Sequence, residues 1–275
     1  MESGARAEGG KERWASLADG LPDTSGEMVR EIMAALKTDG YACLALPVSL
    51  EHHELVAAQI GEVMSRSDVK VDRARAVLQE RTRVVKGRPG PYGSDVMAFH
   101  TDNIRVDVVS MYCIEQDEID GAILLLDTGD LAEQFSPQEI ACLSSLELLA
   151  PPLTAPGQER EDLDYQAPLI SKSEEGYRVY YIPWLVPDWP NSASREMLTR
   201  FFDYLKNKEE TQLIRLPIEK QESVFIDNHR MLHGRGALTE NSKRHMLRHY
   251  ISVPSMSCRS VIKRLQPAAA DQAVR

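Results

Sequence analysis

The spacing of apolar side chains changes several times along the chain, and each change marks a predicted element. Residues 26–39 and 194–208 repeat apolar positions every three to four residues, which predicts two amphipathic helices. In the second of these, Met197, Phe201 and Leu205 form one stripe. Ser136, followed three residues later by Glu139, has the pattern of a capping box and predicts a further helix start. Another helix is expected from residue 50 to about residue 65.

Strands are predicted where apolar residues alternate with polar ones or where β-branched residues gather. These segments are residues 41–48, 98–114, 120–128, 176–189, 223–228 and 245–253. The strands fill the middle and end of the chain, whereas helices lie at the front and one long helix interrupts the strands. This order favours a mainly β (α+β) fold, a sheet sandwich or barrel with peripheral helices, over a parallel α/β fold.

The same pattern divides the chain into one domain with two less regular ends. Residues 1–25 are rich in Gly, Glu, Ser and Lys without periodicity, and we interpret them as a flexible leader. Residues 26–260 form the predicted domain, with an inserted lid or helix region at about 130–220. Residues 261–275 are expected to be a tail. Glycines and prolines at residues 86–93 predict a loop.

Composition excludes several classes of partner. The formal net charge of -10 argues against nucleic acid and anionic membrane surfaces, which require a basic protein surface. No segment approaches the roughly 20 apolar residues that span a bilayer. The four cysteines are scattered and are expected to be buried thiols in a reducing compartment. A cytoplasmic protein that binds a small molecule is the expectation, and a homodimer is compatible with it.

The residues with the clearest chemistry are His100, Asp102 and His233. On a strand, positions i and i+2 point to the same side, so the sequence predicts an imidazole and a carboxylate side by side. With His233 as a third ligand, two histidines and one carboxylate leave three positions open on an octahedral metal, as in non-haem Fe(II) oxygenases. A zinc hydrolase is disfavoured because no HExxH-like base accompanies the ligands. An isolated His-x-Asp triplet alone is a weak signal.

Two arginines follow His233 and strengthen the hypothesis. Arg244 lies eleven residues after it and Arg248 fifteen, in a segment that alternates as a strand, so both are expected to share one face with Tyr250. Guanidinium groups bind carboxylates through two parallel hydrogen bonds. The sequence therefore predicts a carboxylate-binding device close to the metal.

Together these motifs resemble a known family. The HTD triplet at 100–102, the segment from Gly121 to Thr128, DNHRMLHGR at 227–235 and RHMLRHY at 244–250 resemble the TauD/TfdA-like (clavaminate-synthase-like) 2-oxoglutarate oxygenases. The resemblance covers about residues 27–255. It implies a double-stranded β-helix, or jelly roll, with Fe(II), 2-oxoglutarate and O2 as cofactors and co-substrates.

The resemblance also implies individual roles. His100, Asp102 and His233 match the iron ligands. Arg244 matches the arginine that holds the distal carboxylate of 2-oxoglutarate, and Thr128 matches a threonine hydroxyl on that carboxylate.

Arg248 matches an arginine that contacts an acidic group of the primary substrate. Arg83, Arg88 and Tyr92 precede the metal strand, where the family has a wall of the active site. The cluster of Tyr181, Trp184 and Trp189 is interpreted as core or lid, with core favoured.

The expected activity is hydroxylation of an unactivated C–H bond in a small carboxylate-bearing molecule, an amino acid or a natural-product intermediate, with release of succinate and CO2. Related halogenases replace the metal carboxylate by a small residue, so an intact Asp102 implies oxygen transfer. Desaturation or cyclisation on the same scaffold remains an alternative. A β-helix protein that binds a small molecule without turnover is the alternative from another class.

Overall fold

The computed structural model describes residues 25–45, 47–70, 97–116, 121–150, 165–186, 192–239, 242–257 and 259–264 of the 275-residue chain. The predicted leader, apart from residue 25, and most of the predicted tail lie outside these ranges. So do Arg83, Arg88, Tyr92 and Trp189, whose predicted roles fall on residues that the structure does not describe.

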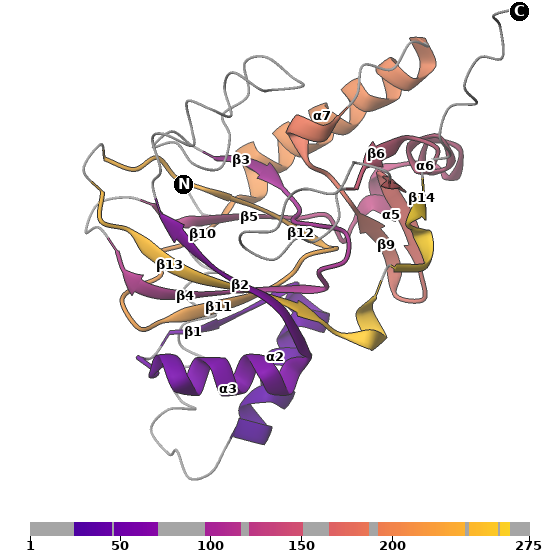
Figure 1. Ribbon diagram of the computed structural model, residues 1–275. Coiled ribbons are helices and arrows are strands. Elements are labelled where there is room, and N and C mark those ends of the chain that lie inside the picture. The colour runs from indigo at the N-terminus through magenta and orange to yellow at the C-terminus, as the bar shows by residue number, and fades with distance from the viewer. Residues whose placement is uncertain are drawn as a thin grey trace, which may run out of the picture.

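Two antiparallel sheets face each other (Figure 1). The five-stranded sheet has the order β1 (Tyr41–Leu44), β11 (Ser223–Asp227), β4 (Val108–Glu115), β13 (His245–Ser252) and β2 (Glu62–Lys70). The four-stranded sheet has the order β10 (Ile214–Leu216), β5 (Ile123–Asp127), β12 (Met231–Arg235) and β3 (Met97–His100). Neighbours far apart in sequence pair throughout. This strand-rich arrangement confirms the mainly β jelly roll with helices outside.

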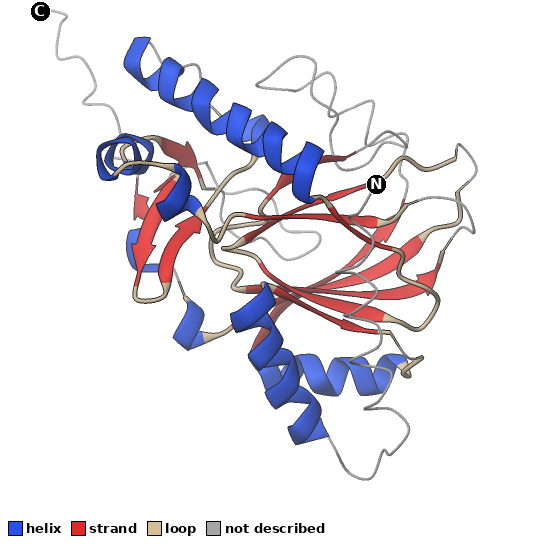
Figure 2. Cartoon of the chain, turned by 180° about the vertical axis from the view of Figure 1, so that it is seen from behind, coloured by secondary structure: helices blue, strands red, loops and turns tan. Residues whose placement is uncertain are grey.

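Helices cover the outer faces of both sheets (Figures 1 and 2). Helices α2 (Ser25–Asp39) and α3 (Leu50–Ile60) lie against the five-stranded sheet, and α7 (Ser192–Gln212) lies over the four-stranded sheet. None of the helices in the described ranges is long and apolar enough to cross a membrane.

The residues between β5 and α7 in sequence form a smaller region, which packs beside the two sheets. It contains α5 (Leu131–Gln134), α6 (Pro137–Ser144), β6 (Glu147–Leu149), β7 (Tyr165–Pro168), β8 (Ile170–Ser173), β9 (Gly176–Val179) and the 3-10 helix η1 (Pro183–Leu185). The C-terminal elements η2 (Pro254–Met256), η3 (Arg259–Val261) and β14 (Lys263–Arg264) return to it, and β14 pairs with β7. The predicted capping box is confirmed, because Ser136 and Glu139 bond reciprocally at the start of α6.

Three apolar clusters explain why the layers hold together. One lies between the sheets and includes Val109, Ile123, Leu125 and Val224. A second joins α2 and α3 to the outer face of the five-stranded sheet, with Phe225 among its members. The third joins α7 and the smaller region to the outer face of β5 and β12. Alternate residues along each strand thus serve different clusters, as the two-residue period of a strand requires.

Several predicted boundaries are wrong. The strand predicted over 176–189 ends at Val179 as β9, and η1 follows it. The second helix ends at Ile60 rather than near residue 65, and residues 62–70 form β2, which pairs with β13 along its length. The backbone of Gly61 is extended and closes the helix. The single strand predicted over 98–114 is two strands, β3 and β4, which belong to different sheets. The chain crosses between the sheets at residues 101–107, and this crossing places the site described next.

Candidate metal centre

The structure brings His100, Asp102 and His233 together between the two sheets. His100 ends β3 and pairs in register with His233 on β12, so their rings lie 4.5 Å apart between centroids. Oδ2 of Asp102 lies 3.3 Å from Nε2 of His233. One donor atom from each of the three residues lies within 4.8 Å of the others. All three side chains are buried. His233 lies within β12, and the turn that joins β11 to β12 precedes it at residues 228–230.

Asp102 reaches this position from a loop and not from a strand. Asn228, in the turn between β11 and β12, accepts a 2.7 Å hydrogen bond on Oδ1 from the backbone N–H of Asp102. Its Nδ2 donates to the carbonyl oxygens of Val106 at 2.8 Å and Asn103 at 3.3 Å. The strand spacing predicted correctly that His100 and Asp102 are neighbours. However, Asp102 lies in a loop after the strand, and Asn228 holds it there. A fully buried amide fastens the loop that carries the carboxylate.

The protonation states suit a metal. Nδ1 of His100 lies 2.8 Å from the Ala98 carbonyl oxygen, so it is the donor and Nε2 keeps its lone pair. Burial, with the nearby His233, lowers the pKa of His100 to about 3, and the imidazole is neutral at pH 7. Burial opposes ionisation of Asp102, but Arg248 and the two histidines outweigh it, so the pKa of Asp102 is lowered.

The donor set fits a divalent transition metal. Nε2 of His233 is buried and, among the residues that the structure describes, has no hydrogen-bond partner of acceptable geometry, even though Asp102 is close. Two neutral imidazoles and one carboxylate are the ligands that such ions bind while three coordination positions stay open. These residues could therefore hold an Fe(II) ion, and a metal would satisfy the buried nitrogen.

Arg248 and Tyr250 approach the same carboxylate from β13, in the opposite sheet. Nη1 of Arg248 lies 3.3 Å from Oδ1 of Asp102, and the Tyr250 hydroxyl donates to Oδ1 at 2.8 Å. The guanidinium carbon of Arg248 lies 4.5 Å from the centre of the Tyr250 ring, a cation–π distance. The expectation that the two share one face is confirmed.

Arg244 comes earlier in the same segment, directly before β13, and is 5% exposed. A methyl group added at Gly121 would lie 2.8 Å from its Cδ and 2.5 Å from Leu238, so the glycine leaves room for the arginine. Gly121 also has a φ of +88°. Arg235 of β12 is buried as well, and Arg248 is half-buried.

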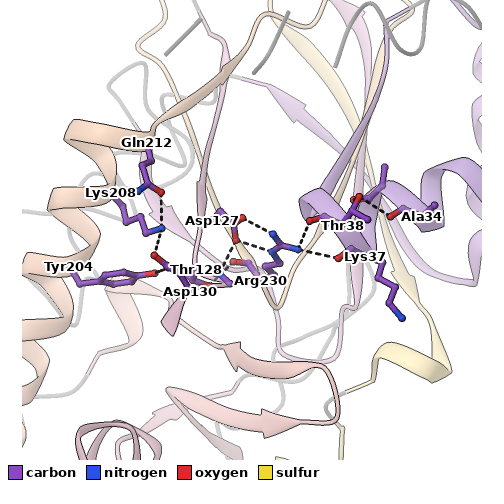
Figure 3. Close-up of polar contacts among 12 residues, drawn as sticks. Ala34, Lys37, Thr38, Asp127, Thr128, Asp130, Tyr204, Lys208, Gln212 and Arg230 are labelled. Carbon is purple, nitrogen blue, oxygen red and sulfur yellow. Dashed lines mark hydrogen bonds and ion pairs between the residues drawn. The ribbon is translucent and has the colours of Figure 1, made fainter. Parts of the chain in front are cut away.

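The structure does not bring Thr128 to Arg244. The Thr128 hydroxyl donates to the Arg230 carbonyl oxygen at 2.6 Å, in the turn before β12 (Figure 3). Gly121, beside Arg244, and Thr128 lie at opposite ends of β5, about 20 Å apart at the rise of a strand. The hydroxyl supports a structural network in which Asp127 pairs with Arg230, and Arg230 in turn bonds the last carbonyls of α2.

Two other buried histidines, His229 and His53, have structural contacts. His229 bonds the fully buried Asp107 at 3.0 Å, and Asp107 accepts from the backbone of Val253 at 2.7 Å. His229 and His233 lie on a turn and a strand, so they do not form a helical zinc pair. His53 is fully buried because α3 turns this side chain toward the five-stranded sheet, where Ser110 contacts it.

The segment before α7 forms one wall of the site. Thr101, between the two ligands, bonds the backbone of Tyr181 twice: its N–H donates to the Tyr181 carbonyl oxygen at 2.7 Å, and its hydroxyl oxygen accepts from the Tyr181 N–H at 3.0 Å. This link places the half-buried ring of Trp184 5.0 Å from the His100 ring. Tyr181 itself is buried against Phe201, as core. The strand-like aromatic pattern could have suggested contact, but not with His100.

Comparison with known proteins supports the metal centre that the geometry indicates. Residues 9–250 match the model of the taurine catabolism dioxygenase TauD, TfdA family. The chain belongs to this family. The match spans both histidines, Asp102 and both arginines, and it confirms the resemblance inferred from the motifs. No curated protein is similar enough in sequence to match the chain.

Solved structures of similar fold include those of two oxygenases. An asparagine oxygenase in complex with Fe(II), 2S,3S-3-hydroxyasparagine and succinate is 16% identical, with a TM-score of 0.60 over 90% of this chain and 83% of that one. The non-heme iron oxygenase OrfP in complex with Fe, succinate and (3S)-hydroxy-L-Arg is 17% identical, with a TM-score of 0.60 over 96% and 98%. OrfP has also been solved with Fe and alpha-ketoglutaric acid, at 16% identity and a TM-score of 0.59, covering 91% of this chain and 92% of that one.

Proposed function

We propose that this TauD/TfdA-family protein is an Fe(II)/2-oxoglutarate-dependent dioxygenase that hydroxylates a C–H bond of a free amino acid or a related small carboxylate. The observation that carries the proposal is the buried set of His100, Asp102 and His233 between the sheets. The iron, when bound, couples the oxidative decarboxylation of 2-oxoglutarate to succinate and CO2 with insertion of one oxygen atom into the C–H bond.

The protein's own residues prepare this chemistry by position and charge. The His100 imidazole is neutral and the Asp102 carboxylate is ionised, so neither must lose a proton before a metal binds. The three ligands come from a strand end, a strand centre and a buried loop, which limits their movement. Trp184 packs beside His100 and excludes water from that side.

Arg244 is the proposed anchor for the distal carboxylate of 2-oxoglutarate. It is buried, belongs to the segment that also supplies Arg248 to Asp102, and has its stem packed against Gly121. Its Cα lies about 13 Å from that of Arg248 at the rise of a strand, so the two guanidinium groups serve different ends of the site. A bidentate contact would contribute about 1.5–3 kcal/mol.

An amino acid is the proposed substrate class. The asparagine oxygenase and OrfP structures hold hydroxylated amino acids, and both share this fold. Arg248 adds a half-buried positive charge beside the metal ligands, suited to a substrate carboxylate once a metal shares the charge of Asp102. An aromatic ring, Trp184, borders the same space.

The proposal is tested by incubating the protein with Fe(II), 2-oxoglutarate and air, with each of the common amino acids in turn. Succinate release coupled to a product heavier by one oxygen atom is the expected result. A product lighter by two hydrogens would identify desaturation or cyclisation instead. If 2-oxoglutarate does not bind the metal-loaded protein, the non-catalytic binding protein becomes the better description.

A pair of glycine variants tests the role of Arg244 without removing a charge. Gly121→Ala should displace Arg244 and raise the KM for 2-oxoglutarate by about 10-fold or more, since a charged hydrogen bond would be lost. Gly176→Ala is the matched control, because it also has a positive φ, +133°, but no atom lies within 4 Å of the added methyl. Equal KM values for 2-oxoglutarate in the two variants would contradict the proposal that Arg244 binds this co-substrate.

A further inference from the structure

The two carboxylate oxygens of Asp102 have different partners. Oδ1 of Asp102 accepts the Tyr250 hydroxyl at 2.8 Å, whereas Oδ2 faces Nε2 of His233 at 3.3 Å. We infer that Tyr250 is a positioning residue that holds Oδ1 away from the metal, so that Asp102 binds through Oδ2 alone. The inference deepens the proposed function and rests on the metal site proposed there.

Arg248 does not make this distinction. Its Nη1 lies 3.3 Å from Oδ1 and 3.4 Å from Oδ2, so its charge stabilises the carboxylate without selecting one oxygen. The hydroxyl of Tyr250 is the short contact, and it reaches one oxygen only. The choice of the metal-facing oxygen therefore depends on the phenol, and the charge balance depends on the guanidinium.

The ring of Tyr250 is itself held in place. On β13 it lies between Val109 of β4 and Ser65 of β2, its partners in the two neighbouring strands. The ring packs against the apolar cluster between the sheets, and the Arg248 guanidinium stacks on it. On the other side of the carboxylate, Asn228 fixes the backbone of Asp102. Both ends of the Asp102 residue are thus restrained.

The consequence concerns the number of open coordination positions. Two histidines and one carboxylate oxygen leave three of six positions open. A carboxylate that bound through both oxygens would leave two, which a chelating keto acid would fill, with none for O2. The hydrogen bond from Tyr250 therefore keeps the third position available.

The test is Tyr250→Phe, which removes one hydroxyl, with Tyr112→Phe as the matched control. Tyr112 donates its hydroxyl to the Val48 carbonyl oxygen at 2.9 Å from the other face of the five-stranded sheet. Co(II) binding to the intact protein is measured by titration, the visible spectrum is recorded at saturating Co(II), and turnover is measured with Fe(II). Tyr250→Phe should weaken Co(II) binding and lower kcat by about 10- to 100-fold, the usual effect of losing a group that orients a metal ligand.

The spectrum gives the readout that a merely structural role would not change. Tyr250→Phe saturated with Co(II) should differ from wild type in its visible bands, while Tyr112→Phe should match wild type. If both variants match wild type in affinity, spectrum and kcat, Tyr250 is structural and the inference fails alone. If wild type binds no Co(II), the proposed metal site and this inference fail together.

Discussion

Two buried histidine pairs lie on opposite faces of the five-stranded sheet, and only one of them forms a candidate site. His100 and His233 lie 4.5 Å apart between the sheets, and His53 and His249 lie 5.3 Å apart beneath α3. In both pairs burial is the main cause of a lowered pKa, to about 3 for both His100 and His53. Burial and pKa therefore do not separate a site from a packed core.

The third partner separates the pairs. The inner pair has Asp102, whose carboxylate is buried and lies 3.3 Å from His233. The outer pair has Glu54, 3.7 Å from His249, with a side chain that is 37% exposed. Around His53 lie the rings of Tyr112 and Phe225 and the hydroxyl of Ser110. A buried anionic ligand that faces both imidazoles defines the metal centre, and the outer pair lacks one in that position.

The largest effect should come from removing the carboxylate of each pair. Asp102→Ala should abolish metal binding and succinate formation, because two imidazoles alone do not complete the ligand set. Glu54→Ala should leave both unchanged and alter stability by less than about 1 kcal/mol, since its ion pair is partly exposed. Fe(II) titration and a succinate assay measure the contrast. An Asp102→Ala variant with full turnover would contradict the assignment.

The next largest effect concerns the apolar surroundings of the outer pair. Phe225 is fully buried against His53, so Phe225→Ala should lower the free energy of unfolding by about 3–5 kcal/mol. Metal affinity of the folded variant should stay that of wild type, because Phe225 faces away from the ligands. Urea unfolding and Co(II) titration are the measurements. A large loss of affinity in the folded variant would show that the two faces are coupled.

A pH-dependent effect should separate the outer pair from a solvated histidine. The pKa of His53 is lowered to about 3, so below its unfolded value near 6.5 the unfolded chain binds a proton that the folded chain does not. Stability is therefore lost as pH falls from about 6.5 toward 3. Between pH 6 and 5, His53→Leu should lose about 1 kcal/mol less than wild type. Urea midpoints of the metal-free proteins at both pH values provide the check. Identical slopes would mean that His53 charges in the folded state.

The smallest effect compares two hydroxyls. Ser110 Oγ lies 3.3 Å from Nε2 of His53, so Ser110→Ala should cost about 0.5–1.5 kcal/mol of stability without changing metal affinity. Tyr250→Phe on the inner face should lower metal affinity more than it lowers the free energy of unfolding. Thermal unfolding and Co(II) titration of both variants sharpen the comparison. A metal defect in Ser110→Ala would not fit it.

Much of the site could be predicted from short patterns. The His-x-Asp triplet, the distant His233 and the arginines at fixed spacings identified a ligand set that the structure does bring together. The helix start at Ser136 and the long helix α7 also followed from local rules, because caps and apolar stripes depend on neighbours within a few residues. Boundaries such as that of α3 did not, because β2 forms by pairing with a strand almost 200 residues away.

The sequence by itself determined the donor types, their order and the strand-rich fold, since these depend on residue chemistry and short-range periodicity. Only the tertiary structure decided how Asp102 is presented, because Asn228 holds its loop from 126 residues away. It also separated Thr128 from Arg244, buried His53 and set Tyr250 against Asp102. Each of these depends on contacts between residues distant along the chain, where direction and distance follow from the packing of the two sheets and not from spacing in the sequence.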